Sequence, residues 1–210
     1  MDRQHLRKII VETVLAFEGA PYVAIGVSNR HIHLSQEDVD VLFGTGYELT
    51  AFRELNQTGE FACNEMVSAV GSKGRIDKIR VLGPLRKATQ LELSLTDTFS
   101  IGVPCQVSES GNLTGAGKVR LENPATGAFV ERACGIVAMR HIHLKPETAA
   151  RFGLKDRQIV SLKYGEGLRA IQFGGVLLRV SPSFNDEAHL DTDEANAGAI
   201  KTGDLGLIIL

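Results

Sequence analysis

The 210-residue sequence has little excess charge of either sign. It contains 23 Lys and Arg against 25 Asp and Glu, which gives a formal net charge of −2. A chain that binds nucleic acid or an anionic membrane through its overall field carries a large positive excess, so we expect neither partner. The apolar fraction of 43% with 23% charged residues is ordinary for globular chains and excludes a disordered one.

Long apolar runs and paired cysteines are also missing. Charged residues recur so often that no stretch approaches the roughly 18 apolar residues of a membrane span, and Glu12 interrupts what would be the apolar part of a signal peptide. The three cysteines, Cys63, Cys105 and Cys134, lie far apart without CxxC spacing. This usage is typical of reduced, buried cysteines. We therefore expect a cytoplasmic protein.

The first segment has a helical pattern. Between Gln4 and Phe17, apolar residues recur at helical spacing with charges between them, and Gly19 follows as a stop, which predicts an amphipathic helix. Two interpretations stay open. The helix packs on its own domain, which is the more common fate of such a stripe, or it is a tag that docks on another protein.

The rest of the chain favours a mainly β fold. Short apolar runs alternate with glycine turns, and no long helical pattern separates them, which favours barrels or a sandwich over an α/β sheet. Two short helices are predicted: one capped by Ser35, with Asp38 as its capping-box partner, and one that begins at Pro146. The predicted strands are Tyr22–Val27, Ile79–Leu82, Gln90–Leu95, Gly135–Met139, Ile159–Leu162, Gly175–Val180 and Leu205–Leu210.

An internal repeat joins these elements. The pentapeptide Arg-His-Ile-His-Leu occurs at 30–34 and again at 140–144, and each copy leads into a predicted short helix that ends in Phe-Gly. Weaker parallels follow, with a proline at Pro84 and Pro182 and a Thr-Asp pair at 96–97 and 192–193. Repetition of this order indicates two related units, which we interpret as paired β-barrels.

The two His-x-His pairs predict two metal sites. Alternate side chains of a strand share one face, so each pair directs two imidazoles to one point. Zn²⁺ is a common ion that favours imidazole ligands. A single pair is a weak signal, but two copies use four of only six histidines. With a one-residue gap before the Thr-Asp pairs, Glu92 and His189 match as third ligands. From its local pattern alone, Glu92 is equally well explained as a solvated strand carboxylate.

A basic cluster lies near these residues. It includes Arg80, Arg86 and Lys87, and Arg86 follows a Gly-Pro turn that is suited to hold a guanidinium for bidentate contact with a phosphate. The alternative is a solvated basic face. No Walker motif, GxGxxG or GxSxG is present, so those nucleotide and serine-nucleophile devices are not indicated.

Four motifs together resemble the phosphate propanoyltransferases, the PduL-type phosphotransacylases of bacterial microcompartments. The likeness spans about Tyr22 to Leu210. Its motifs are Val-Ser-Asn-Arg-His-Ile-His-Leu at 27–34, Val-Leu-Gly-Pro-Leu-Arg at 81–86, Arg-His-Ile-His-Leu at 140–144 and His-Leu-Asp-Thr-Asp-Glu-Ala-Asn-Ala at 189–197.

The resemblance implies a fold of two small β-barrels that are capped by short helices and interleaved in sequence. One barrel is expected from 20–29 plus 139–210 and the other, with an inserted hairpin, from 30–138. Residues 1–19 are then a possible encapsulation tag, with residues 1–17 as the part that contacts shell proteins. The expected location is the microcompartment lumen, and we also expect a homo-oligomer, a dimer.

The resemblance also implies site residues. Two Zn²⁺ ions per chain are expected, and Arg86 is expected as the catalytic phosphate-site residue. A family lysine is replaced here by Arg53, which we include among the contacts of coenzyme A. The implied metal ligands are His31, His33 and Glu92 for one ion and His141, His143 and His189 for the other; the implied coenzyme A contacts are Ser28, Arg53, Arg80, Leu82, Phe99, His189 and Asn196.

The implied reaction converts a short-chain acyl-CoA, expected to be propanoyl-CoA, and phosphate into acyl phosphate and CoA. Acyl transfer requires oxyanion stabilisation, a positioned nucleophile and a stabilised thiolate, which a dinuclear site is suited to supply. Two alternatives stay open: a dinuclear zinc thioesterase or phosphoesterase that activates water, and a non-catalytic metal-binding barrel that docks in a shell.

Overall fold

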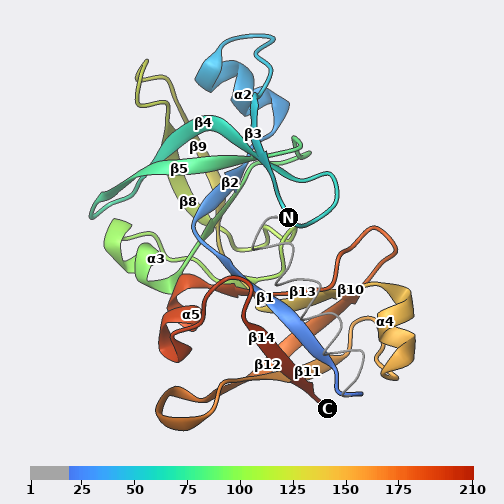
Figure 1. Cartoon of the computed structure of the whole chain (residues 1–210). Coiled ribbons are helices and arrows are strands. Elements are labelled where there is room, and N and C mark those ends of the chain that lie inside the picture. Colours follow the sequence, from blue (N-terminus) through green and yellow to red (C-terminus); the bar gives the residue numbers. More distant parts are fainter. Residues whose placement is uncertain (1–18) are drawn as a thin grey trace. The chain divides into compact units, whose positions relative to one another are not determined.

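The computed structural model describes residues 19–210, so the helix predicted over Gln4–Phe17 and the expected tag over 1–19 fall almost wholly outside the described residues. As predicted, the fold is mainly β, with short helices between the strands. The described chain divides into two compact units, one formed by residues up to Val27 together with Arg140–Leu210 and the other by Ser28–Met139. Figure 1 traces both units along the sequence.

The first unit is a closed six-stranded barrel in the order β1-β13-β10-β12-β11-β14. Its strand β10 runs parallel to β12 and antiparallel to β13. The bounds of the strands are Tyr22–Ser28 for β1, His141–Leu144 for β10, Ile159–Tyr164 for β11, Ile171–Val180 for β12, Glu187–Asp191 for β13 and Leu205–Ile209 for β14.

The second unit also closes on itself. Strands β4, β5, β2, β6, β9 and β8 pair in this order, and β8 returns to pair with β4. Two further strands extend this sheet, β3 beside β4 and β7 beside β9. The bounds are His31–His33 for β2, Ala51–Glu54 for β3, Phe61–Val70 for β4, Arg75–Gly83 for β5, Gln90–Leu93 for β6, Val107–Ser108 for β7, Gly117–Glu122 for β8 and Phe129–Ala138 for β9.

The two barrels have the same pairing scheme around their His-x-His strands. Strand β2 lies between a parallel partner, β5, and an antiparallel partner, β6, as β10 does between β12 and β13. The strand that precedes each pentapeptide belongs to the other unit, since β1 pairs in the first barrel and β9 in the second. The structural repeat is therefore interleaved, with its first strands exchanged.

Each barrel is filled by alternate side chains of its strands. Ile32 and Leu34 are buried in one core, and Ile142 and Leu144 are buried in the other. Because side chains alternate between the two faces of a strand, the histidines that alternate with these core residues project from the outer face of each barrel. The sequence Arg-His-Ile-His-Leu thus uses its Ile and Leu to anchor the strand and its histidines to build a site.

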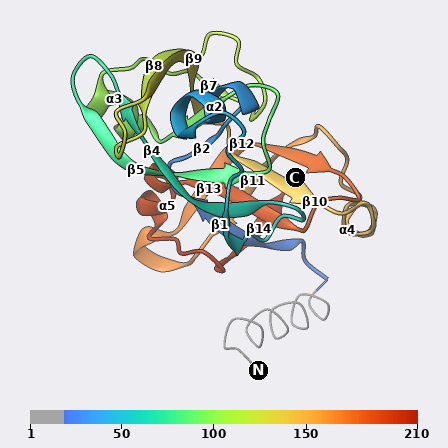
Figure 2. The same ribbon diagram turned by 90° about the horizontal axis from the view of Figure 1, so that it is seen from above.

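Within residues 19–210, four short α-helices each follow a strand: α2 at Gln36–Phe43, α3 at Leu95–Ile101, α4 at Pro146–Arg151 and α5 at Thr192–Gly198. Helix α2 lies against β9, as the view in Figure 2 shows. Ser35 caps α2 as predicted, but the second half of the predicted capping box is wrong. The carboxylate of Asp38 instead binds Arg132 and Thr89, because the backbone N–H of Ser35 donates to the Thr89 hydroxyl.

Helices α3 and α5 were not predicted, and they correct the alignment of the repeat. Each begins with a capping box, Ser94 with Asp97 in α3 and Asp191 with Glu194 in α5. Residues 96–97 therefore match 193–194, one position later than the Thr-Asp pairing suggested. Counted back from the N-caps, Glu92 and His189 each lie two residues before the cap, so no gap is needed to match them. The predicted strand Gln90–Leu95 also ends earlier, at Leu93, because Ser94 starts the helix.

The cysteines agree with their predicted role. Cys63 and Cys134 are buried, Cys105 is partly buried, and all three are free thiols. Burial raises the pKa of Cys63 to about 11 and that of Cys134 to about 12, so both remain protonated at neutral pH. Among residues 19–210, no helix is long and apolar enough to cross a membrane.

Candidate metal centres and substrate site

The strand register brings each predicted third ligand beside the first histidine of its pair. His31 lies opposite Glu92 across β2 and β6, and His141 lies opposite His189 across β10 and β13. In antiparallel strands, directly opposed side chains share a face and lie close together. The solvated-carboxylate interpretation of Glu92 is wrong, because its residue is only 8% exposed.

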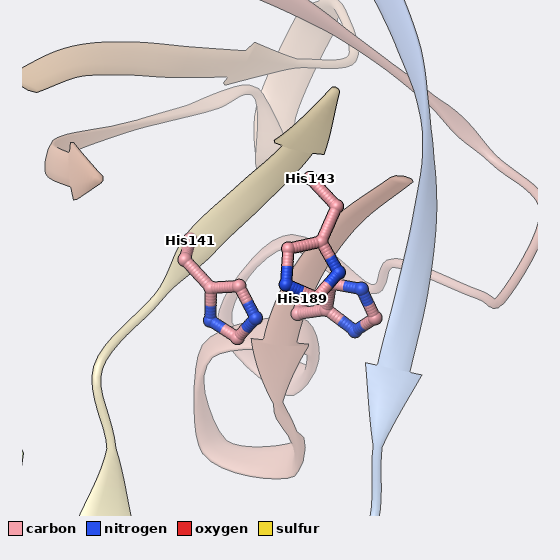
Figure 3. Close-up of side chains that lie close together, drawn as sticks. All are labelled: His141, His143 and His189. Atoms are coloured by element: carbon pink, nitrogen blue, oxygen red, sulfur yellow. The ribbon is translucent and has the colours of Figure 1, made fainter. Parts of the chain in front are cut away.

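The first unit gathers three imidazoles. The potential ligand atoms of His141, His143 and His189 all lie within 4.8 Å of one another, and the ring centroids are 4.7–4.8 Å apart. Figure 3 shows the three rings grouped beside β10 and β13. Phe184 stacks on His143 with 3.9 Å between ring centroids, which shields one face of this ring from water.

His143 is held neutral. Burial, then the neighbouring His189 and His141, lower the pKa of His143 to about 2. Among the described residues, neither Nδ1 nor Nε2 of this ring has a hydrogen-bond partner. A buried, neutral imidazole without a partner is costly unless its lone pair binds something, and coordination of a metal cation uses that lone pair.

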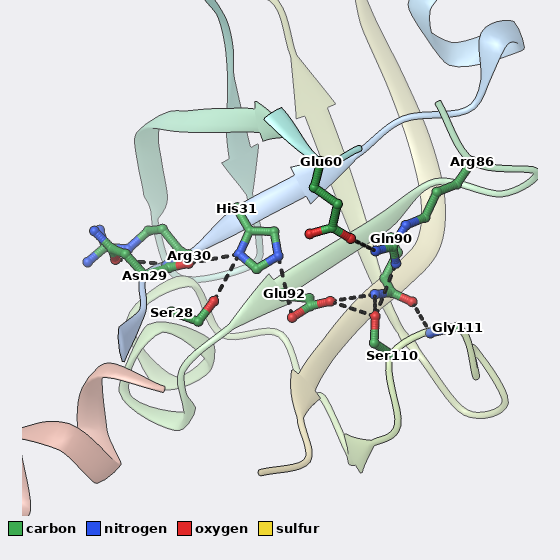
Figure 4. A network of polar contacts seen from close by, with 10 residues as sticks. All are labelled: Ser28, Asn29, Arg30, His31, Glu60, Arg86, Gln90, Glu92, Ser110 and Gly111. Atoms are coloured by element: carbon green, nitrogen blue, oxygen red, sulfur yellow. Dashed lines mark hydrogen bonds and ion pairs between the residues drawn. The ribbon is translucent and has the colours of Figure 1, made fainter. Parts of the chain in front are cut away.

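The second unit gathers His31, His33 and Glu92, whose potential ligand atoms also lie within 4.8 Å of one another. Nδ1 of His31 lies 2.9 Å from the Asn29 carbonyl. A carbonyl only accepts, so Nδ1 carries the proton and donates it there. Nε2 therefore faces the carboxylate, 3.4 Å from Oε2 of Glu92, as Figure 4 shows.

The charges of this cluster support one another. Burial alone lowers the pKa of His31, but the attraction and hydrogen bond of Glu92 outweigh it and raise the pKa. Burial likewise favours protonated Glu92, but the charge and hydrogen bond of His31 hold the pKa of Glu92 well below its usual range. Burial, then the charges of His31 and Arg86, lower the pKa of His33 to about 3. The cluster thus presents an ionised carboxylate beside a neutral imidazole.

A polar network holds the other oxygen of Glu92. Oε1 accepts from Nε2 of Gln90 at 2.6 Å and from the Ser110 hydroxyl at 2.9 Å. The same hydroxyl accepts from Nη1 of Arg86 at 3.0 Å, and Nη2 of Arg86 lies 3.9 Å from Glu60. Figure 4 shows this chain from Glu92 through Ser110 to Arg86. Arg86 is therefore linked to the cluster by one shared side chain.

Both clusters fit a zinc ion. Ligands at about 2.0–2.1 Å in tetrahedral geometry are roughly 3.3 Å apart, close to the 3.4 Å between His31 Nε2 and Glu92 Oε2. The partnerless nitrogens of His143, together with Nδ1 of His33, give further unused donors. His₃ and His₂Glu are donor sets that catalytic zinc uses, with a position open for substrate.

The arginine of each pentapeptide was not singled out from the sequence. Nε of Arg30 lies 3.2 Å from Asp97, and Nε of Arg140 lies 2.7 Å from Glu194. Each partner is the third residue of the helix that follows the third ligand. Each ion pair connects the start of a His-x-His strand to the helix that follows the third ligand. The identical arginine in both copies of the pentapeptide is the sequence pattern that indicates this role.

The residues expected to contact coenzyme A occupy both units. In the second unit, Ser28 lies 3.4 Å from His31 Nδ1, and Arg80 lies opposite His31 in the register of β2 and β5. Arg53 and Leu82 both lie opposite Ala62, on the two sides of β4. Phe99 is 70% exposed on α3. Asn196 is on α5 of the first unit, where its carbonyl accepts from Arg169.

The fold and the clusters define a class of protein. It has two β-barrels in one chain, and each barrel carries a His-x-His strand with a third potential metal ligand on the adjacent antiparallel strand. The family model for phosphate propanoyltransferase matches residues 24–201. The chain is 48% identical over 189 residues to a phosphate propanoyltransferase of Thermotoga maritima, with 90% of each chain covered. It is 44% identical over 214 residues to that of Priestia megaterium, covering 100% of this chain and 98% of the relative. The chain therefore belongs to the phosphate propanoyltransferase family, and it is a phosphotransacylase.

Proposed function

We propose that this protein transfers the propanoyl group between coenzyme A and phosphate, with two zinc ions at the clusters His31/His33/Glu92 and His141/His143/His189. The observation that carries the proposal is the repetition of one ligand arrangement at two sites within a chain of this family. Two zinc ions, when bound, would supply positive charge that stabilises the CoA thiolate and the phosphate oxygens.

Arg86 is the proposed phosphate anchor. Its guanidinium is held through Ser110, and its side chain remains 31% exposed, so it can still reach a substrate. A guanidinium binds two phosphate oxygens at once and compensates charge as the acyl group is transferred. An oxygen of the bound phosphate attacks the thioester carbonyl and forms a C–O bond. The C–S bond then breaks, and CoA leaves as the thiolate. No protein nucleophile is required.

Coenzyme A is proposed to contact Ser28, Arg53, Arg80, Leu82, Phe99, His189 and Asn196. Within the second unit, the cationic side chains among them suit the phosphates of CoA. Arg80 is braced by the carbonyls of Cys63 and Asn64 and lies over the ring of Phe52. Such bracing limits the conformational entropy that binding must remove.

The reaction is tested by release of CoA thiol from a panel of acyl-CoAs, with and without phosphate. Acyl phosphate is trapped in parallel as the hydroxamate. The proposal requires CoA release that depends on phosphate, equals the acyl phosphate formed, and is fastest with propanoyl-CoA. CoA release without phosphate and without acyl phosphate would identify a hydrolase instead, and no turnover despite bound zinc would identify a binding protein.

We also propose that residues 1–19 direct the protein into the lumen of a microcompartment and that the protein assembles as a dimer. The amphipathic pattern of Gln4–Phe17 supports the first proposal. A fusion of residues 1–19 to a fluorescent protein should co-localise with shells, and deletion of these residues should leave kcat unchanged. Loss of soluble, active protein on deletion would instead indicate a helix that packs on its own barrel. Light scattering of the full chain measures the oligomeric state.

A further inference from the structure

We propose that Gln90 and Glu187 are positioning residues, each matched to the chemistry of the third ligand in its own cluster. Gln90 is an amide that donates to a carboxylate ligand. Glu187 is a carboxylate that balances an all-histidine cluster. The inference rests on the proposed metal sites and adds two residues that are not themselves assigned as ligands.

The two residues occupy equivalent places. Gln90 lies two positions before Glu92 and opposite His33, and Glu187 lies two positions before His189 and opposite His143. Residues two apart in a strand share one face, so each side chain lies beside the ligand that follows it. Both residues are buried, at 1% exposure for Gln90 and 8% for Glu187.

Gln90 uses its whole amide to fix Glu92. Its Nε2 donates to Oε1 of Glu92 at 2.6 Å and to the Ser110 hydroxyl at 2.8 Å, while its Oε1 accepts from the backbone N–H of Gly111 at 2.6 Å. The Gly111 bond fixes which end of the amide faces the ligand. Oε1 of Glu92 is thereby occupied, and Oε2 is left toward His31 as the oxygen for the metal.

Glu187 has the opposite chemistry at the equivalent position. Its Oε2 lies 3.5 Å from Nε2 of His189, so the negative charge of this carboxylate lies next to the three imidazoles and favours a bound cation. The neighbouring strand makes room for it at Gly26. A Cβ built on Gly26 would lie 2.8 Å from Oε1 and 3.0 Å from Cδ of Glu187.

The charge of the ligands explains why one cluster has an amide, Gln90, where the other has a carboxylate, Glu187. A divalent ion with two imidazoles and Glu92 keeps one uncompensated positive charge, whereas three neutral imidazoles leave two. A buried charge without compensation is costly. Glu187 lowers the all-histidine cluster to the same net charge as the other, and a second carboxylate in place of Gln90 would instead repel Glu92.

The test measures zinc affinity of metal-free protein by chelator competition at one fixed pH, so that catalytic activity is not needed. His33→Ala and His143→Ala assign the two dissociation constants to the two clusters. Glu187→Gln keeps the shape and removes the charge, and Gln90→Leu removes the donor. Gly26→Ala displaces Glu187 without changing any polar group. The matched controls are Glu166→Gln and Gln172→Leu, at exposed positions of the first unit.

We expect Glu187→Gln and Gly26→Ala to weaken zinc at the all-histidine cluster, and Gln90→Leu to weaken it at the other, each by about ten- to hundredfold. The two control variants should keep the parental zinc affinity at both clusters. Unchanged zinc affinity in Glu187→Gln and Gln90→Leu would overturn the inference, as would equal weakening of both clusters by either variant. A protein that binds two zinc ions but does not transfer acyl groups to phosphate would refute the proposed function and leave this inference standing.

Discussion

Replacement of Arg86 by lysine separates phosphate recognition from general charge. In the parent, the Arg86 guanidinium is anchored through Nη1 to the Ser110 hydroxyl at 3.0 Å, while its backbone N–H donates to the Leu34 carbonyl at 2.9 Å. Lysine keeps the charge and the backbone bond. It cannot reproduce the planar pair of donors that binds two phosphate oxygens while a third donor holds Ser110.

The magnitude follows from the bonds lost. Loss of one charge-assisted hydrogen bond costs about 1.5–3 kcal/mol, which corresponds to a decrease of about ten- to hundredfold in kcat/KM for phosphate. The KM for propanoyl-CoA should change much less. The assay is the initial rate of CoA release at saturating propanoyl-CoA over a range of phosphate concentrations.

Two further variants sharpen the result. Lys87→Gln removes a neighbouring exposed charge and should leave kcat/KM for phosphate within about twofold of the parent. Ser110→Ala keeps the guanidinium but removes its anchor, so we expect an intermediate loss. If Arg86→Lys and Lys87→Gln both remained within twofold, Arg86 would belong to a solvated basic face. A selective rise in the KM for acyl-CoA would place Arg86 at the CoA phosphates and refute the phosphate assignment.

Two further predictions concern metal binding and stability. His143→Ala removes one ligand of three and should reduce the zinc content to one ion per chain with loss of most turnover; two ions bound at parental affinity, measured by metal analysis, would contradict the two-cluster assignment. Glu65 accepts from the Tyr47 hydroxyl and from the N–H and hydroxyl of Thr50, and although burial opposes it, these bonds lower the pKa of Glu65. A carboxylate with a lowered folded-state pKa stabilises the fold above its unfolded-state pKa and loses this contribution as the pH falls through its folded-state pKa. Glu65→Gln should therefore lower the free energy of unfolding, measured with urea, by about 1.5–3 kcal/mol at pH 7 and by less at a pH below the folded-state pKa of Glu65. An equal loss of unfolding free energy at pH 7 and at the acidic pH would show that ionisation of Glu65 is not involved.

The two clusters could be predicted from the sequence because most of their residues are histidines, a rare residue type in this chain, and because the motif that contains them occurs twice. His31, His33, His141 and His143 stand in identical pentapeptides, and the fold brings Glu92 and His189 to matching places. The mainly β class was also predictable, since the strands are short and separated by glycine turns.

Other parts were outside the reach of local pattern. Ser110 and Gln90 approach Glu92 from positions 18 and 2 residues away, and neither residue type indicates a metal site by itself. The exchange of β1 and β9 between the barrels depends on strand pairing between distant segments, and it was expected only through the family resemblance. The capping boxes Ser94 with Asp97 and Asp191 with Glu194 indicate the starts of α3 and α5. Aligning the repeat on its two Thr-Asp pairs instead shifted the second copy by one residue, so the two boxes were not matched.

Zinc titration of the metal-free protein shows whether acyl transfer to phosphate requires a metal ion at both clusters. Acyl phosphate formation from propanoyl-CoA and phosphate is measured after each addition of zinc, beside the amount of zinc bound. We expect no turnover without metal, and full turnover only when the second equivalent of zinc is bound. Full turnover in the metal-free protein, or a plateau of turnover at one equivalent of zinc, would contradict a role for two metal ions.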